Sequence, residues 1–146
     1  MRLRATIFAA LAIAGLMAAA PPDTASIVNS GSTNTLGYTI TVSSDGKGSL
    51  AMQDGGSAST PKPFTIAADL TARFFSDLAA ARKGNARTVP CMKSASFGSS
   101  VHVTWQDWKS PDLTCPPKDS LGEALVKDVD EIRQAAGVSA APLRQH

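Results

Sequence analysis

The segment LGYTITVSSDGKGSLAM, residues 36–52, decides the fold that this sequence predicts. In its first half Tyr38, Ile40 and Val42 alternate with threonine and serine, which is typical of a strand buried on one face only. A turn signal follows, and apolar side chains resume after it. The segment therefore predicts a β-hairpin, and the loop length decides which face of the second strand is buried.

Side-chain parity selects the length of this loop. A two-residue loop at Asp45-Gly46 would put Leu50 on the face opposite Ile40, because successive side chains of a strand point to opposite faces. A three-residue loop that starts at Ser44 pairs Ile40 with Leu50 instead. Gly46 then takes the left-handed position of a bulged turn, which glycine tolerates. We therefore predict the three-residue loop.

A helix is predicted after this hairpin. The polar stretch DGGSASTPKP, residues 54–63, indicates a connecting loop. The next segment, FTIAADLTARFFSDLAAARKG (64–84), carries Leu70, Phe74 and Leu78 at four-residue spacing, as an amphipathic helix does. Its last residue is a glycine, which is a common helix stop.

The second half of the chain repeats this order. SVHVTW (100–105) alternates like a strand, and KSPDLTC (109–115) can pair with it, although its proline limits it to an edge or a bulge. The final segment, DSLGEALVKDVDEIRQAAG (119–137), opens with Ser120 and Glu123 in capping-box spacing. The predicted buried stripe of this helix is Leu121, Leu125, Val129 and Ile132.

Together these elements predict an α+β fold. It consists of an antiparallel sheet of four to five strands with two helices packed on one face, in the order strand-strand-helix, twice. The fifth strand would be ASIVN, residues 25–29. The half-buried strands and the amphipathic helices each have one apolar side, so each layer covers the other.

The N-terminal segment MRLRATIFAALAIAGLMAAAPPDT, residues 1–24, predicts export. Arg2 and Arg4 precede an uncharged run that ends at Ala20, which is too short to span a bilayer comfortably as a helix of roughly 20 residues. This composition indicates a cleavable secretory signal peptide, with an N-terminal membrane anchor as the alternative. We therefore expect a secreted or periplasmic protein, with no stable membrane insertion after signal cleavage.

The cleavage position sets the predicted domain boundaries. Ala18-Ala19-Ala20 is the obvious A-x-A site, but Pro21 would follow that cut and should hinder the peptidase. A cut one or two residues earlier avoids the proline. We predict a signal peptide at residues 1–19, a single α+β domain at 20–137 and a flexible C-terminal tail at 138–146.

The charge balance argues against a nucleic-acid partner. The whole chain has 14 basic and 12 acidic residues. Arg2 and Arg4 leave with the signal peptide, so the mature chain is neutral. Nucleic-acid binding depends on clustered lysine and arginine, and only the pair Arg82-Lys83 stands together in the mature chain.

The two cysteines, Cys91 and Cys115, stand 24 residues apart. In an exported chain an even cysteine count predicts a disulfide. The spacing excludes a C-x-x-C redox motif, and two cysteines without a histidine pair do not make a zinc site. We predict a Cys91–Cys115 disulfide that stabilises the fold by about 3–4 kcal/mol. A catalytic thiol and an intermolecular bridge are the alternatives.

Short motifs distributed over the mature chain carry a resemblance. They are NSGSTNTLGYTITVSSDGKG (29–48), FFSDLAAAR (74–82), and CMKSASFG (91–98) followed by SPDLTC (110–115). These motifs resemble small exported bacterial proteins that carry no assigned function, and the hairpin-helix order is similar to a broader bacterial domain of unknown function. The resemblance implies the fold and the compartment, but no catalytic residue, cofactor or substrate.

No catalytic signature is found in the sequence: it has no G-x-S-x-G, no H-E-x-x-H, no P-loop and no dinucleotide-binding fingerprint. His102 lies on the polar face of its predicted strand, so a structural histidine is favoured over a general base. The acidic run Asp128, Asp130 and Glu131 is predicted to be a solvated helix face. We expect no enzymatic activity, no metal and no cofactor.

The predicted contact surface is the tip of the second hairpin, WQDWK (105–109). A three-residue loop of Gln106, Asp107 and Trp108 keeps the two flanking strands in parity and places Trp108 at the tip, beside Lys109. Tryptophan is enriched at contact surfaces. A longer loop, and a Trp108 that folds back over the sheet edge, both remain open.

These observations predict a small, non-catalytic, disulfide-stapled binding module. Its predicted binding residues are Gln106, Asp107, Trp108 and Lys109, and its partner is an unknown protein or a cell-envelope component. The alternative is a secreted inhibitor of an extracellular hydrolase, and a hydrolytic enzyme that uses His102 is ranked last.

Overall fold

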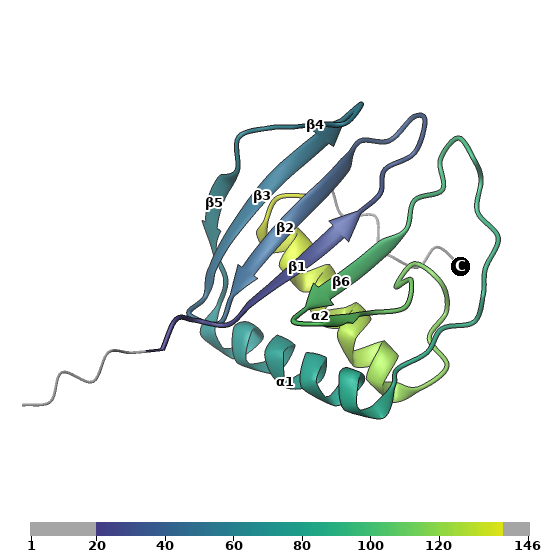
Figure 1. Cartoon of the computed structure of the whole chain (residues 1–146). Helices are drawn as coiled ribbons and strands as arrows, with labels where there is room; N and C mark the ends of the chain where they lie inside the picture. Colours follow the sequence, from purple (N-terminus) through teal and green to yellow (C-terminus); the bar gives the residue numbers. More distant parts are fainter. Residues whose placement is uncertain (1–19, 139–146) are drawn as a thin grey trace, which may run out of the picture.

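The computed structural model describes residues 20–138, which form one sheet and two helices (Figure 1). The predicted signal peptide, 1–19, and all but the first residue of the predicted tail lie outside the described residues. In chain order the elements are β1 (Thr24–Asn29), β2 (Gly37–Ser43), β3 (Lys47–Asp54), β4 (Ser57–Ala58), β5 (Lys62–Thr65), α1 (Ala68–Gly84), β6 (Val101–Trp105), β7 (Trp108–Lys109) and α2 (Ser120–Ala135).

The sheet is antiparallel between all neighbouring strands, in the order β4-β3-β2-β1-β6-β7. Strand β5 pairs with the other end of β3. Both helices lie on one face of the sheet, and they pack against each other (Figure 1). The predicted α+β class is confirmed.

The predicted number of strands was wrong, because the sheet has seven. The two additional strands are short. Strand β4 lies within the segment 54–63 and β5 begins in it, although the polar composition of this segment predicted only a loop. Without them the outer edge of β3 would present unpaired backbone groups. Sheets commonly protect such an edge with short pieces of chain.

The first hairpin has the predicted register. Ile40 lies opposite Leu50 and Tyr38 lies opposite Met52. Gly46 has a φ of 83°, which is the left-handed position expected of a three-residue loop. The possible fifth strand is β1, and it lies between β2 and β6 at the centre of the sheet.

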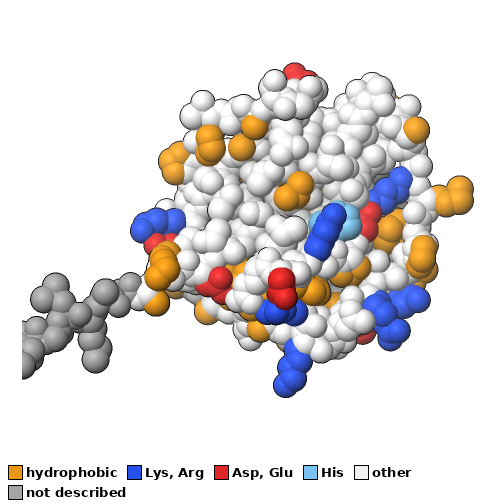
Figure 2. Space-filling model, in the orientation of Figure 1, with side chains coloured by type: hydrophobic (Ala, Val, Ile, Leu, Met, Phe, Trp, Pro, Cys, Tyr) orange, Lys and Arg blue, Asp and Glu red, His pale blue; other side chains and the backbone are white. Residues whose placement is uncertain are grey.

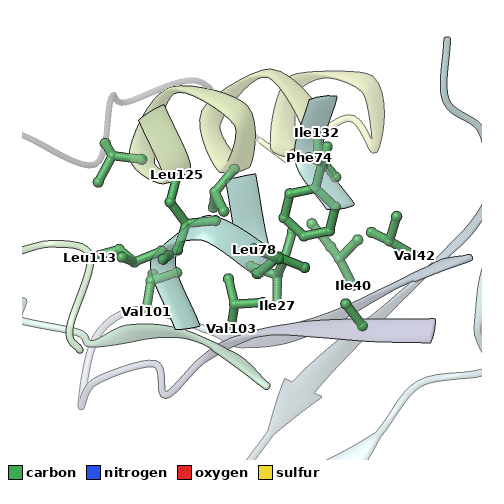
Figure 3. Close-up of a cluster of buried hydrophobic side chains, with 14 of the residues drawn as sticks. Ile27, Ile40, Val42, Phe74, Leu78, Val101, Val103, Leu113, Leu125 and Ile132 are labelled. Atoms are coloured by element: carbon green, nitrogen blue, oxygen red, sulfur yellow. The ribbon is translucent and has the colours of Figure 1, made fainter. Parts of the chain in front are cut away.

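The core lies between the sheet and the two helices (Figure 3). Sheet residues Ile27, Ile40 and Val103 meet Phe74 of α1 and Ile132 of α2, and all five are fully buried. The four-residue spacing in both helices thus identified the faces that contact the sheet. This rigid two-layer body carries the connections described below.

The helix ends differ in detail from the prediction. Helix α1 ends at Gly84, but the residue that adopts the left-handed conformation is its C-cap, Asn85, with a φ of 52°. A side chain at Gly84 would collide with Leu121, so this glycine permits a close helix contact. Helix α2 is capped by the Asp119 carboxylate, which accepts a hydrogen bond from the Gly122 N–H, rather than by the predicted capping box.

The acidic run of α2 is not a solvated face, so this prediction was wrong. Asp128 is only 1% exposed and accepts a hydrogen bond of 2.6 Å from Arg73 Nε of α1. Burial raises the pKa of Asp128 to about 6; the Arg73 hydrogen bond opposes the rise and Asp77 adds to it. Glu131 pairs with Arg73 at 2.7 Å, and Asp130 pairs with Arg133 at 2.7 Å.

Candidate functional site

The connection from α1 to β6 contains the two most exposed large apolar side chains of residues 20–138, Met92 and Phe97. We call residues 88–100 the stapled loop; it contains no helix and no strand, and it runs beside the sheet (Figure 1). Met92 is fully exposed, with a relative area of 101%, Phe97 is 70% exposed and Val89 is 43% exposed. Apolar side chains held in solvent in this way mark a candidate contact surface.

The predicted Cys91–Cys115 disulfide is present, and it ties this loop to the core. Cys115 is buried, and it follows the fully buried Leu113, whose N–H donates a hydrogen bond to the Val101 carbonyl. Cys91 is on the exposed side of the bridge. The disulfide therefore holds the residue beside Met92 against the hydrophobic core.

Backbone hydrogen bonds hold both ends of the stapled loop. At its start the Val89 N–H donates to the Pro116 carbonyl over 2.7 Å. At its end the Ser30 N–H donates to the Ser100 carbonyl over 3.0 Å. These contacts use backbone groups, so they restrain the path of the loop without consuming its side chains.

The tip of the stapled loop is held by the β1–β2 connection. The Ser96 carbonyl accepts hydrogen bonds from the Asn34 N–H at 3.1 Å and from Ser32 Oγ at 2.9 Å. Within the tip the Gly98 N–H donates to the Ser94 carbonyl over 2.7 Å and closes a turn. Residues far apart in the sequence therefore support one another at this edge.

Lys93 anchors the middle of the loop through its side chain. Its Nζ donates hydrogen bonds to the Ser99 carbonyl at 2.8 Å and to Thr114 Oγ1 at 2.6 Å, and it pairs with the Asp112 carboxylate. Burial raises the pKa of Asp112, but the hydrogen bonds from Lys93 and Thr114 outweigh this and keep the pKa below its ordinary value. The ion pair therefore persists at neutral pH.

A cleft of about 760 Å³ lies between the stapled loop, strands β2 and β3 and the end of α2. Its walls include Tyr38, Leu50 and Met52 from the sheet and Lys93 and Phe97 from the loop. The cleft thus separates part of the loop, including Phe97, from strands β2 and β3.

The second hairpin differs from the prediction. Trp105 and Trp108 pair directly, so the loop consists of two residues, Gln106 and Asp107, and the predicted three-residue loop was wrong. Gln106 accepts the left-handed conformation that such a tight turn requires, with a φ of 54°. Trp108 is therefore in a strand and partly buried against the core, not at the tip.

The tip of this hairpin is bound to α1. Arg82 donates hydrogen bonds of 2.5 Å to Gln106 Oε1 and to Asp107 Oδ1. Trp105, on the core side, packs edge-to-face on Phe75 and lies under the Arg82 guanidinium. The binding role predicted for residues 106–109 stays a prediction, although Gln106 and Asp107 already have a side-chain partner, Arg82, within the molecule.

The open face of the sheet carries few charged side chains (Figure 2). A row across four strands consists of Thr104, Ser26, Thr41 and Ser49. His102 lies on this face, and its Nδ1 is 2.9 Å from the Ser110 carbonyl oxygen. This contact directs the Nδ1 side of the imidazole toward a backbone carbonyl.

Residues 20–138 contain neither a candidate metal-ligand cluster nor a membrane-spanning helix. In this part of the chain, no three histidine, cysteine, aspartate or glutamate side chains gather in a way that could hold a metal ion. None of the described helices is long and apolar enough to cross a membrane. The stapled loop is thus the feature with the clearest geometry for a function.

Only its exposed side chains gave a sequence-level signal for this site. Met92 and Phe97 are apolar residues within a segment rich in serine and glycine, and such a segment does not bury apolar side chains in a sheet or a helix. The supporting contacts from Ser32 and Asn34 have no sequence signal, because they are distant in the chain. Comparison of the chain with protein-family models, with curated proteins and with solved structures finds no match.

Proposed function

We propose that this protein is a small exported binding module that holds a protein partner on its stapled loop. The observation that carries the proposal is the fully exposed Met92 next to the disulfide-bonded Cys91. A methionine side chain in this position buries no apolar surface, so it does not stabilise the fold. It is available for a partner.

The restraint of the loop supports this function energetically. Ordering a flexible loop on binding costs free energy, and a loop that is already restrained avoids much of that cost. Here the disulfide, the hydrogen bonds to Ser96 and the Lys93 anchor restrain the backbone before a partner arrives. The exposed side chains then contribute their burial to affinity.

The second candidate, a secreted inhibitor of an extracellular hydrolase, is favoured by the same loop. Inhibitors of this kind bind with little backbone movement, so they present a chain segment that is preformed. A loop without secondary structure, held at both ends and at one disulfide, fits that requirement. A disulfide also fits the oxidising compartment that the N-terminal segment predicts.

Two variants decide whether the stapled loop or the hairpin tip is the contact. The purified disulfide-bonded protein is immobilised, and extracellular and periplasmic fractions of the native host are passed over it. We expect a retained protein that is lost with Met92→Asp and kept with Trp108→Ala. Retention that depends on Trp108 and not on Met92 would transfer the site to the hairpin.

A further inference from the structure

We propose, on the basis of the binding function above, that the partner is a serine endopeptidase with an apolar specificity pocket. The stapled loop would enter its active site as a substrate does, with the Met92–Lys93 peptide bond at the catalytic serine. This bond has an exposed apolar side chain on one side and an ion-paired lysine on the other.

On the acyl side of the bond, Met92 projects fully into solvent while its neighbour is fixed. An endopeptidase selects substrates chiefly through the side chain that precedes the scissile bond, and an apolar pocket accepts a long unbranched one. Met92 has such a side chain, with a relative exposed area of 101%. Cys91, one residue earlier, is bonded to the buried Cys115.

On the amine side of the bond, Lys93 is fixed through its own side chain. Its Nζ contacts the Ser99 carbonyl, Thr114 Oγ1 and the Asp112 carboxylate. Thr114 is the residue before Cys115, so both sides of the bond are fastened to the same short segment of the core. Two bonds of the stapled loop, Cys91–Met92 and Met92–Lys93, lie between this covalent anchor and this ionic anchor. Only the second is preceded by a fully exposed apolar side chain, because the Cys91 side chain is used by the disulfide.

Two neighbouring bonds fit less well. The Lys93–Ser94 bond would require the lysine to enter the pocket, but its side chain is only 25% exposed and is held by three contacts. Phe97 is exposed, but it lies inside the turn closed by the hydrogen bond between Gly98 and Ser94. Proteases bind extended chain, and this turn is not extended.

The chemistry explains how a substrate-like loop becomes an inhibitor. The serine hydroxyl adds to the Met92 carbonyl carbon, and the C–N bond between Met92 and Lys93 breaks. The proton of the hydroxyl passes through the protease histidine to the backbone nitrogen of Lys93. The products are an ester between the protease serine and the Met92 carbonyl group, and a free α-amino group on Lys93. Since both ends stay anchored, the amine remains at high effective concentration beside the ester.

Religation then competes with hydrolysis. Attack of the Lys93 amine on the ester reforms the peptide bond and returns the proton to the serine. Attack of one water molecule instead yields a Met92 carboxylate and a Lys93 ammonium group, and the disulfide still joins the two halves. The protease therefore remains occupied by a loop that it cuts slowly.

The first test measures inhibition of two purified enzymes, chymotrypsin with an apolar pocket and trypsin with an acidic one. We expect the disulfide-bonded protein to inhibit chymotrypsin and not trypsin. Met92→Ala should raise the inhibition constant on the order of 100-fold or more, as loss of a central anchor does. Met92→Lys should transfer inhibition to trypsin, and the control Lys127→Ala, at an exposed position of α2, should change neither constant.

The second test identifies the bond. After incubation with catalytic amounts of chymotrypsin, mass spectrometry of the reduced protein should show one cut, after Met92. Lys93→Ala should speed this cut several-fold, because the α-amino group formed at residue 93 is no longer held in place through the side chain, whereas Lys127→Ala should not. A cut after Lys93 would overturn the assignment of the bond.

The two proposals fail in different ways. The protease proposal is overturned if neither protease is inhibited. It is also overturned if the inhibition constants do not change in the Met92 variants. The binding function still stands in that case if a protein other than a protease is retained through Met92. If the immobilised protein retains no partner through the stapled loop, and neither protease is inhibited, both proposals are overturned.

Discussion

The stapled loop and the tip of the β6–β7 hairpin are both exposed connections, but their side chains are held in opposite ways. At the hairpin tip, Gln106 and Asp107 are bonded to Arg82, and Trp108 is paired in a strand. In the stapled loop the backbone is bonded, while Met92 and Phe97 project into solvent.

This difference shows that an aromatic residue near a turn is not by itself a contact site. The tryptophans of the hairpin serve the core, since both pack against it. The stapled loop is held in place by the disulfide to Cys115, so none of its apolar side chains has to be buried to fix its position. Its apolar side chains are therefore available for another molecule.

The largest expected effect is a difference in unfolding free energy between two phenylalanine variants, one in the core and one in the stapled loop. Phe74→Ala should lower the free energy of unfolding by about 3–5 kcal/mol, because it opens a cavity at a fully buried position. Phe97→Ala should change it by less than about 0.5 kcal/mol, as a surface substitution does. Urea unfolding of both variants measures the two values, and similar losses would mean that the loop is part of the core.

The second effect concerns the disulfide. Replacing Cys91 and Cys115 together by serine should lower the free energy of unfolding by about 2–4 kcal/mol, because the unfolded chain gains freedom. Limited proteolysis should then cut the stapled loop much faster, while the hairpin tip stays protected by its Arg82 contacts. Equal protection of the loop with and without the disulfide would contradict its role as the main restraint.

The third effect is a pH dependence of the body that carries both regions. The folded-state pKa of Asp128 is raised to about 6 from 3.8, so the folded state binds this proton more tightly than the unfolded chain does. The stability that this group contributes is fully present below pH 3.8 and is lost as the pH rises through about 6. The change is roughly 1–3 kcal/mol.

The control is Asp128→Asn, which cannot titrate. The difference in unfolding free energy between the natural chain and this variant should fall between pH 4 and pH 7. A difference that stays constant, or rises, would show that Arg73 keeps the carboxylate charged throughout this range.

The smallest effect is at the hairpin tip. Arg82→Ala should cost less than about 1 kcal/mol, since Asp107 is 79% exposed and pairs of this kind contribute little. Amide hydrogen exchange should accelerate at Gln106 and Asp107 and remain unchanged at Ser96. Faster exchange in the stapled loop as well would mean that the two regions are coupled.

Much of the fold was predictable because it depends on local patterns. Alternation and parity gave the register of Ile40 with Leu50, and four-residue spacing gave the buried faces of both helices. The same parity argument failed at the second hairpin. It treated residues 109–115 as a regular strand, whereas the regular pairing stops at Lys109 and Pro111 follows it.

The candidate site was predictable only in part. The sequence indicated the Cys91–Cys115 bridge, because two cysteines have one intramolecular pairing and the N-terminal segment predicts an oxidising compartment. It did not indicate that the bridge would expose Met92, because exposure depends on where the loop leaves the core. The supporting bonds from Ser32 and Asn34 depend on the position of the β1–β2 connection beside the loop.

By itself, therefore, the sequence determined the α+β class, the disulfide pairing and the apolar faces, because each follows from periodicity or from cysteine count. Only the tertiary structure decided that Asp128 is buried against Arg73, that Trp108 belongs to a strand, and that Met92 stands free. These three outcomes depend on which distant segments meet, and distant contacts have no period in the chain.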